Sequence, residues 1–190
     1  MGNVNFLQLS SWAWLLMMLY WLYAGMKTKM TIRKQNNFSR LSHLFLVISA
    51  FALIYEERSA VGFLKQRLFP ENDYIKILGL LINLAGIIFA IRARTWLGTN
   101  WSATVTVKKD HDLIRSGPYA ITRHPIYTGM LFGIVGAAFI VGEIRGFLAV
   151  GLFLIAMEIK MATEEKFMKS VFPSYGDYMK RTKKLIPLIY

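Results

Sequence analysis

The segment from Phe6 to Met26 holds 21 residues without a charge, and it restricts the possible folds of this chain more than any other feature. A helix of about 20 apolar residues is long enough to cross the hydrocarbon core of a bilayer. A signal peptide would instead carry a basic leader and a shorter apolar core. The first five residues are uncharged, so we expect a retained membrane span here.

Apolar blocks of similar length recur along the rest of the chain, and short charged segments separate them. Only 18 % of the 190 residues are charged and 55 % are hydrophobic, whereas a soluble domain holds about 25 % charged residues. We therefore predict an all-α integral membrane protein with about five transmembrane helices. The four later spans are expected at Leu41–Tyr55 with a continuation to Phe63, at Tyr74–Ile91, at Ile126–Val141, and from Phe147 onward as a helix that reaches about Phe172.

The positive charges predict how these helices are oriented, because Lys and Arg collect on cytoplasmic loops. If the N-terminus lies outside, 18 of the 23 Lys and Arg residues fall on the cytoplasmic side, in loops 27–40 and 92–124 and in the tail from Lys160. The C-terminus is then cytoplasmic. The net charge of +12 fits this topology and contact with anionic membrane lipids, and no nucleic-acid partner is expected.

The chain length favours one membrane-embedded domain over residues 1–190. Three spans would occupy residues 1–95, and the part that carries chemistry would occupy 96–190. A long polar connection at 96–125 separates them; its β-branched run Thr104–Val107 favours an extended conformation. A short basic helix is expected at Tyr175–Lys184. The oligomeric state stays open.

The segment Ser116–Gly129, SGPYAITRHPIYTG, is the polar stretch in which we expect a small-molecule site. The residue before a proline is pushed away from helical geometry, and proline suits the first turn of a helix. His124 therefore lies at the start of the fourth span. Because the fourth and fifth spans form a hairpin, their cytoplasmic ends are neighbours, and the charged end of the fifth span, with Lys160 and Glu164, should lie beside His124.

Structural roles also account for some of these residues. Arg123 suits a helix start at the interface with its charge in water, and Lys160 and Glu164 are spaced as a surface pair of a helix. Gly129, Gly133 and Gly136 share one helix face, which favours close packing against another helix. The chain has no cysteine, and its three histidines lack the spacing of a metal site, so no metal is expected.

The run LIRSGPYAITRHPIYTG, followed after a two-span hairpin by EEKFMKSVFPSYGDYMKR, resembles the isoprenylcysteine carboxyl methyltransferase family. That family lies within a wider group that includes phospholipid N-methyltransferases. The resemblance covers Lys108 to Pro187. It implies an S-adenosylmethionine-dependent membrane methyltransferase with a cytosol-facing cofactor pocket built from the 96–125 connection, the 126–165 hairpin and the C-terminal tail. By position, the implied cofactor-binding residues are His111, Asp112, Leu113, Ile114, Tyr119, His124, Pro125, Ile126, Tyr127 and Glu164.

Acceptor chemistry is expected to depend on Lys160, Arg123 and Glu165. Lys160 stands where the family often has an arginine, and a lysine cannot form the same bidentate fork with a carboxylate. A positive charge on Lys160 or on Arg123 would orient an acceptor carboxylate and disfavour a cationic amine. A carboxylate needs no general base, whereas an amine acceptor would need one, with Glu165 or His124 as candidates. We therefore favour methylation of the carboxylate of a lipophilic substrate such as a prenylated cysteine.

Three other functions remain open at this point. The first is a phospholipid or small-lipid N-methyltransferase, because the wider group includes such enzymes. The second is a sterol-type membrane reductase, because those enzymes carry a related C-terminal signature. The third is a helical membrane module without enzymatic activity, whose charged loops only satisfy topology.

Overall fold

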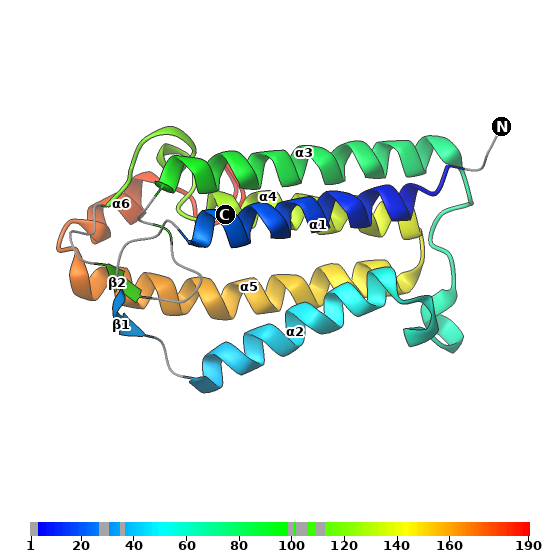
Figure 1. Cartoon of the computed structure of the whole chain (residues 1–190), viewed down its shortest axis with the longest axis horizontal. Coiled ribbons are helices and arrows are strands. Elements are labelled where there is room, and N and C mark those ends of the chain that lie inside the picture. The colour runs from blue at the N-terminus through cyan, green and yellow to red at the C-terminus, as the bar shows by residue number, and fades with distance from the viewer. Residues whose placement is uncertain (1–3, 27–30, 35–36, 99–100, 102–105, 109–112) are drawn as a thin grey trace.

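The structure is a computed structural model of the chain, and it describes residues 4–26, 31–34, 37–98, 101, 106–108 and 113–190. The described residues fold into long helices with a small two-stranded ribbon at one end (Figure 1). The elements, with η for short 3-10 helices, are α1 (Phe6–Gly25), β1 (Thr31–Lys34), α2 (Asn37–Tyr55), η1 (Glu57–Ser59), η2 (Gly62–Lys65), α3 (Asp73–Leu97), β2 (Thr106–Lys108), η4 (Gly117–Ala120), α4 (Pro125–Val141), α5 (Ile144–Val171) and α6 (Tyr175–Arg181).

The long helices form one bundle whose outer surface is apolar. Within the described ranges, α3 and α5 are long and apolar enough to cross a membrane, and α4 and the Leu41–Tyr55 part of α2 are shorter apolar helices. Large apolar side chains such as Leu16, Leu22 and Phe45 are between 65 % and 70 % exposed. Such a surface is costly in water and is expected where lipid chains surround the protein.

Glycines let α3 and α4 pack with their backbones in contact. A Cβ built on Gly86 would lie 2.5 Å from the carbonyl oxygen of Gly129, and one on Gly136 would lie 2.3 Å from the backbone nitrogen of Asn83. The third predicted glycine, Gly133, faces the indole of Trp14 on α1. The prediction that these glycines permit close helix packing is confirmed.

The second span ends earlier than its sequence suggests. We expected the helix to continue through Ala60 to Phe63, but α2 ends at Tyr55 and the chain continues in the short turns η1 and η2. The carboxylate of Glu56 accepts a hydrogen bond from the backbone nitrogen of Arg58 at 3.1 Å. This local bond replaces the helical ladder, because a side chain that caps a turn competes with helix continuation.

The long elements are all helices, as the all-α prediction requires, and a short ribbon that was not predicted is added to them. β1 pairs antiparallel with β2, with Arg33 opposite Val107, so the two polar loops are joined at one end of the bundle. The extended run expected at Thr104–Val107 falls partly in β2; Thr104 and Val105 lie outside the described residues. α6 also stops at Arg181, short of the predicted end at Lys184.

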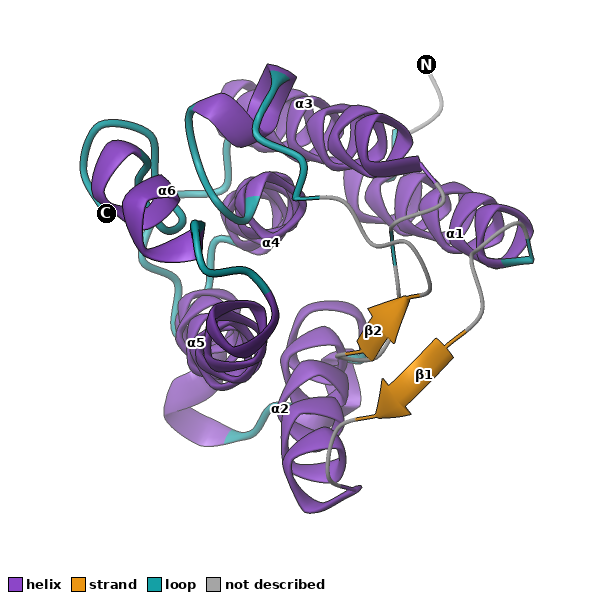
Figure 2. Ribbon diagram, turned by 90° about the vertical axis from the view of Figure 1, so that its left-hand side faces the viewer, coloured by secondary structure: helices purple, strands orange, loops and turns teal. Residues whose placement is uncertain are grey.

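Figures 1 and 2 show that α6, the ribbon, the first turn of α4 and the last turns of α5 gather at the same end of the bundle. We call this the α6 end. It contains the predicted site segment and the C-terminal segment, although these are separated by more than fifty residues in sequence. The opposite end contains the α4–α5 turn and η1 and η2.

Candidate functional site

The C-terminal segment pairs with the residues just before α4 and fixes them in place. The backbone nitrogen of Arg123 donates to the carbonyl of Lys183 at 2.8 Å, and that of His124 donates to the carbonyl of Lys184 at 3.2 Å. Lys183 donates in return to the carbonyl of Ile121 at 3.2 Å. These bonds align two distant segments like neighbouring strands, so the start of α4 is held from outside the helix.

The turn before α4 is shaped by a glycine and a tryptophan. Gly117 has a φ of 58°, a conformation that disfavours other residues, and a Cβ there would lie 2.4 Å from the ring of Trp96. The indole nitrogen of Trp96 donates to the hydroxyl of Ser116 at 3.1 Å. The end of α3 thereby positions the polar segment that leads into α4.

His124 lies between two adjacent carboxylates of α5. Its Nε2 is 3.3 Å from Oε1 of Glu165, and its Nδ1 is 3.5 Å from Oε2 of Glu164. The imidazole itself is buried, with 7 % of its surface exposed. Burial alone would lower the pKa of His124, but the hydrogen bonds and negative charges of both glutamates outweigh it and raise this pKa above its ordinary value.

Tyr127 completes the contact between α4 and α5. Its hydroxyl donates to Oε1 of Glu164 at 2.6 Å, and its ring stacks on His124 with centroids 5.6 Å apart. Lys160, one turn before Glu164, places its Nζ 5.8 Å from the centroid of the Tyr127 ring. The hairpin predicted from the sequence therefore brings His124, Tyr127, Lys160 and Glu164 together.

Arg123 and Glu165 form a buried ion pair. The Nε of Arg123 donates to Oε1 of Glu165 at 2.8 Å, and the two side chains are 9 % and 12 % exposed. The guanidinium also donates to the backbone carbonyls of Met179 and Thr182. With these bonds, Arg123 connects the start of α4, the end of α5 and the segment around α6.

The hydrogen bonds of Tyr119 join α3 and α6 to the segment before α4. Tyr119 is buried, its hydroxyl donates to the carbonyl of Ala93 on α3 at 3.4 Å, and its own carbonyl accepts from the Tyr178 hydroxyl at 2.7 Å. Burial raises the pKa of Tyr178 to about 12. The phenols of Tyr119 and Tyr178 therefore serve as hydrogen-bond donors to backbone at neutral pH.

The remaining predicted cofactor residues occupy three settings. Pro125 and Ile126 form the buried first turn of α4, directly after His124. Leu113 and Ile114 are half-buried in the approach to η4. His111 and Asp112 lie outside the described residues.

Two features of this end were not assigned a role from the sequence. Tyr175 and Tyr178 of α6 are buried and their rings meet edge to face, with centroids 5.7 Å apart. The YxxY spacing was visible but did not show which surface the rings would cover. His43 on α2 also lies near the site, and a single histidine in an apolar run carries no spacing signal.

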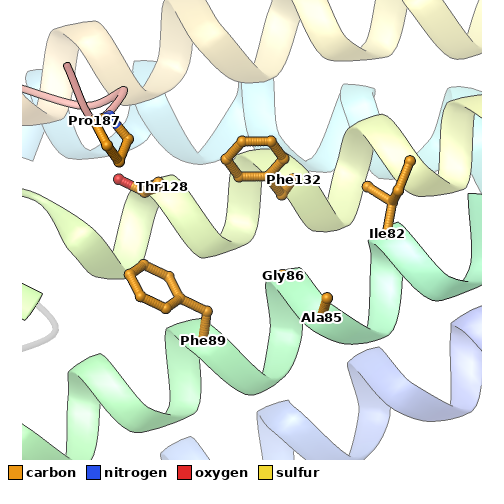
Figure 3. A pocket seen from close by; sticks show the side chains of 7 residues that line it. All are labelled: Ile82, Ala85, Gly86, Phe89, Thr128, Phe132 and Pro187. Carbon is orange, nitrogen blue, oxygen red and sulfur yellow. The ribbon is translucent and has the colours of Figure 1, made fainter. Parts of the chain in front are cut away.

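No cluster of three or more potential metal ligands occurs among the residues that the structure describes. An apolar groove of about 360 Å³ lies between α3 and α4, and its lining contains none of the predicted site residues (Figure 3). Figure 3 places Phe89 and Phe132 on opposite helices of this groove, with Pro187 near Thr128. The groove is lined by Ile82, Ala85, Gly86, Phe89, Thr128, Phe132 and Pro187.

Comparison with known proteins supports an intramembrane methyltransferase fold. The structure of a eukaryotic intramembrane Ras methyltransferase, ICMT (isoprenylcysteine carboxyl methyltransferase), superimposes with a TM-score of 0.51. The identity is 22 %, over 83 % of this chain and 55 % of that one. At this identity the similarity establishes the fold, a multi-pass helical membrane protein.

Sequence comparison shows the family. The profile of the phospholipid methyltransferase family matches residues 74–175, which is more than half of the chain. The chain belongs to this family. The protein-S-isoprenylcysteine O-methyltransferase of Schizosaccharomyces pombe is 35 % identical over 96 residues, which cover 48 % of this chain and 41 % of the yeast protein. The resemblance inferred from the two sequence motifs is therefore confirmed.

Two bacterial proteins named for metal resistance are also similar. The cobalt-zinc-cadmium resistance protein CzcN of Cupriavidus metallidurans is 27 % identical over 118 residues, covering 62 % of this chain and 53 % of that protein. The nickel-cobalt-cadmium resistance protein NccN of Alcaligenes xylosoxydans xylosoxydans is 25 % identical over the same length, covering 62 % and 54 %. The chain spans about half the length of the curated relatives it matches.

Proposed function

We propose that this protein is an S-adenosylmethionine-dependent membrane methyltransferase that methylates the carboxylate of a lipophilic acceptor, such as a prenylated cysteine. The observation that carries the proposal is the cluster of His124, Tyr127 and Glu164 at the α6 end. It lies within the residues that match the methyltransferase family. It also lies where an apolar bundle meets polar loops, which suits a substrate with a lipid tail and a charged head.

The chemistry of these side chains fits S-adenosylmethionine. That molecule presents an amino group and ribose hydroxyls as donors, and a sulfonium as a diffuse cation. Glu164 is 23 % exposed and can accept from donors in addition to Tyr127. The Tyr127 ring already attracts the cation of Lys160, and an aromatic face stabilises a nearby cation by about 0.5–2 kcal/mol. When bound, the cofactor supplies an electrophilic methyl group.

The protein's part in such a reaction is alignment, because a methyl group moves by in-line displacement and depends mainly on the orientation of donor and acceptor. Lys160 supplies a positive charge beside Tyr127 that orients an acceptor carboxylate. Arg123 and Glu165 neutralise each other and hold the C-terminal segment against α5. In this proposal they position the site, and a carboxylate acceptor releases no proton that Glu165 would have to take.

The family description favours a second candidate, a phospholipid N-methyltransferase. An amine acceptor must lose a proton, so His124 or Glu165 would then act as a base. The buried pairing of Glu165 with Arg123 opposes that role, because the guanidinium stabilises the unprotonated carboxylate and weakens it as a base.

One labelling experiment separates the two candidates. The purified protein in detergent is incubated with S-adenosylmethionine that carries a radioactive methyl group, and with either an S-farnesylcysteine derivative or phosphatidylethanolamine. We expect the farnesylcysteine product to carry the label, and we expect alkali to release this label as methanol. Alkali hydrolyses methyl esters but does not remove N-methyl groups. Alkali-stable label in phosphatidylethanolamine alone would replace the carboxyl assignment with the amine one.

We further propose five spans with the α6 end in the cytoplasm. The charge distribution supports this, since 18 of 23 Lys and Arg residues would then be cytoplasmic.

A further inference from the structure

His43 is a half-buried titratable side chain outside the part of the chain that matches the family. It lies in the second turn of α2, whereas the family match begins at residue 74. α2 packs against α5, and its first turns point towards the α6 end (Figure 1). Within the part of the chain that the structure describes, the Nε2 of His43 is buried and has no hydrogen-bond partner.

The surroundings of His43 belong to the candidate site. Lys160 and Glu164, both on α5, are the charged groups that act on its imidazole. The same two side chains also contact Tyr127, Lys160 at its ring and Glu164 at its hydroxyl. His43 therefore adds a group from the N-terminal half of the chain to a cluster otherwise built from α4 and α5.

An imidazole at this position can donate a hydrogen bond. A neutral imidazole offers one N–H donor, and its tautomer follows the partner that it meets. A buried polar atom without a partner is unfavourable, and a bound acceptor group would provide the missing bond.

We propose that His43 is a specificity-determining residue of the acceptor site, which donates a hydrogen bond from Nε2 to the acceptor carboxylate while Lys160 supplies the charge. A lysine is a point donor and cannot by itself pair with both oxygens of a carboxylate in a planar fork. His43 and Lys160 together offer two donors from two helices. The inference rests on the proposed function. His43 takes no part in the covalent transfer of the methyl group, so its effect is on acceptor binding.

The test compares three variants in the methyltransferase assay with N-acetyl-S-farnesylcysteine as the acceptor. His43→Phe keeps an aromatic ring and removes the donor. His43→Gln restores a donor near the position of Nε2. Phe45→Leu is the control, because Phe45 lies on the same helix with 70 % of its surface exposed. Acceptor KM, kcat and the Kd of S-adenosylhomocysteine are measured for each.

We expect His43→Phe to raise the acceptor KM by about 10- to 100-fold, the range for a hydrogen bond to a charged group. The kcat and the Kd of S-adenosylhomocysteine should stay within about twofold of the wild-type values, because neither depends on the acceptor bond. His43→Gln should recover part of the loss, and Phe45→Leu should behave as the wild type. In competition experiments, the carboxamide analogue of N-acetyl-S-farnesylcysteine should bind to the wild type more weakly than the carboxylic acid. The difference between the two affinities should be smaller in His43→Phe.

An unchanged acceptor KM in His43→Phe would overturn the inference. So would an equal weakening of S-adenosylhomocysteine binding, which would show that the ring only supports the fold. If the wild type binds no S-adenosylhomocysteine or labels only the amine lipid, the proposed function fails and this inference with it. If the wild type methylates farnesylcysteine and His43→Phe matches it, this inference alone fails.

Discussion

His124 makes the free energy of unfolding depend on pH. Its two carboxylate neighbours raise its pKa in the folded protein above the unfolded value of about 6.5. A raised pKa stabilises the fold fully below the unfolded pKa, and this contribution disappears as the pH rises through the folded pKa. We expect the wild type to melt higher than His124→Gln at about pH 5, and the gap to shrink towards about pH 9.

The measurement is the thermal unfolding midpoint in detergent across that pH range. His124→Gln is the suitable reference, because glutamine keeps a polar side chain that does not titrate. A gap that widens as the pH rises would show that His124 is neutral in the folded protein.

Glu164 and Tyr127 are predicted to hold the cofactor through their charge and hydroxyl. Glu164→Gln keeps the shape of the side chain and removes the charge, so it should weaken S-adenosylhomocysteine binding by about 10- to 100-fold, the range for a charge-assisted bond. Tyr127→Phe removes the 2.6 Å hydrogen bond to Glu164. It should lower the affinity for S-adenosylhomocysteine about fivefold, because a hydrogen bond from a neutral donor contributes about 1 kcal/mol. Calorimetric titration in detergent measures both.

The control for this pair is Gly151→Ala, since a Cβ at Gly151 meets no atom within 4 Å. Equal affinity in wild type, Glu164→Gln and Tyr127→Phe would remove these residues from the cofactor site.

The sequence predicted part of this residue-level arrangement. A hairpin between two apolar runs was enough to place His124 beside Glu164, because the ends of antiparallel neighbours must meet. The ion pair between Arg123 and Glu165 was not predicted. The pair depends on which of the adjacent residues Glu164 and Glu165 faces Arg123. That choice is set by the rotation of α5 about its axis, and a periodic apolar pattern does not determine this rotation to within one residue. His43 was missed because its environment comes from another helix.

At the scale of elements, the contact between α3 and α4 is predicted to fail when a glycine is enlarged. A Cβ at Gly136 would lie 2.4 Å from the carbonyl oxygen of Gly79, and a backbone atom cannot rotate away. Gly136→Ala should therefore destabilise the protein by about 1–3 kcal/mol, the cost of overpacking a well-packed core. The unfolding midpoint in detergent measures this loss.

The matched control is again Gly151→Ala, in the interior of α5. Alanine there should be neutral or stabilise by up to about 1 kcal/mol, because glycine is the poorer helix former. Similar melting of both variants would mean that the helices separate easily and that the glycine face is not needed.

Apolar runs predicted the long helices well, because each run is bounded by charges or by turn residues. α2 was predicted too long because Glu56 and Glu57 are compatible with a helix by propensity. The helix end becomes visible only in the structure, where the Glu56 carboxylate accepts a hydrogen bond from the backbone nitrogen of Arg58. The β1–β2 ribbon was not predicted as a pair. A strand pairing between segments more than seventy residues apart leaves no periodic signal in either segment.

At the scale of the whole molecule, the charge distribution predicts which end of the bundle faces the cytoplasm. The α6 end carries most of the basic loops and tail, and each Lys or Arg near an anionic leaflet contributes about 1 kcal/mol. The wild-type chain contains no cysteine, so single cysteines report position without background. Lys180→Cys marks the α6 end and Lys65→Cys the opposite end; the two lysine side chains are 80 % and 47 % exposed.

A membrane-impermeant maleimide added outside intact cells should label Lys65→Cys and leave Lys180→Cys unlabelled until the membrane is permeabilised. The reason is that α3, α4 and α5 separate the two positions, so an odd number of spans places them on opposite sides. Labelling of Lys180→Cys alone would show that the bundle has the opposite orientation, with the site outside the cytoplasm. Labelling of both without permeabilisation would mean that one of these three helices does not cross the membrane, and the shorter α4 would be the first to test.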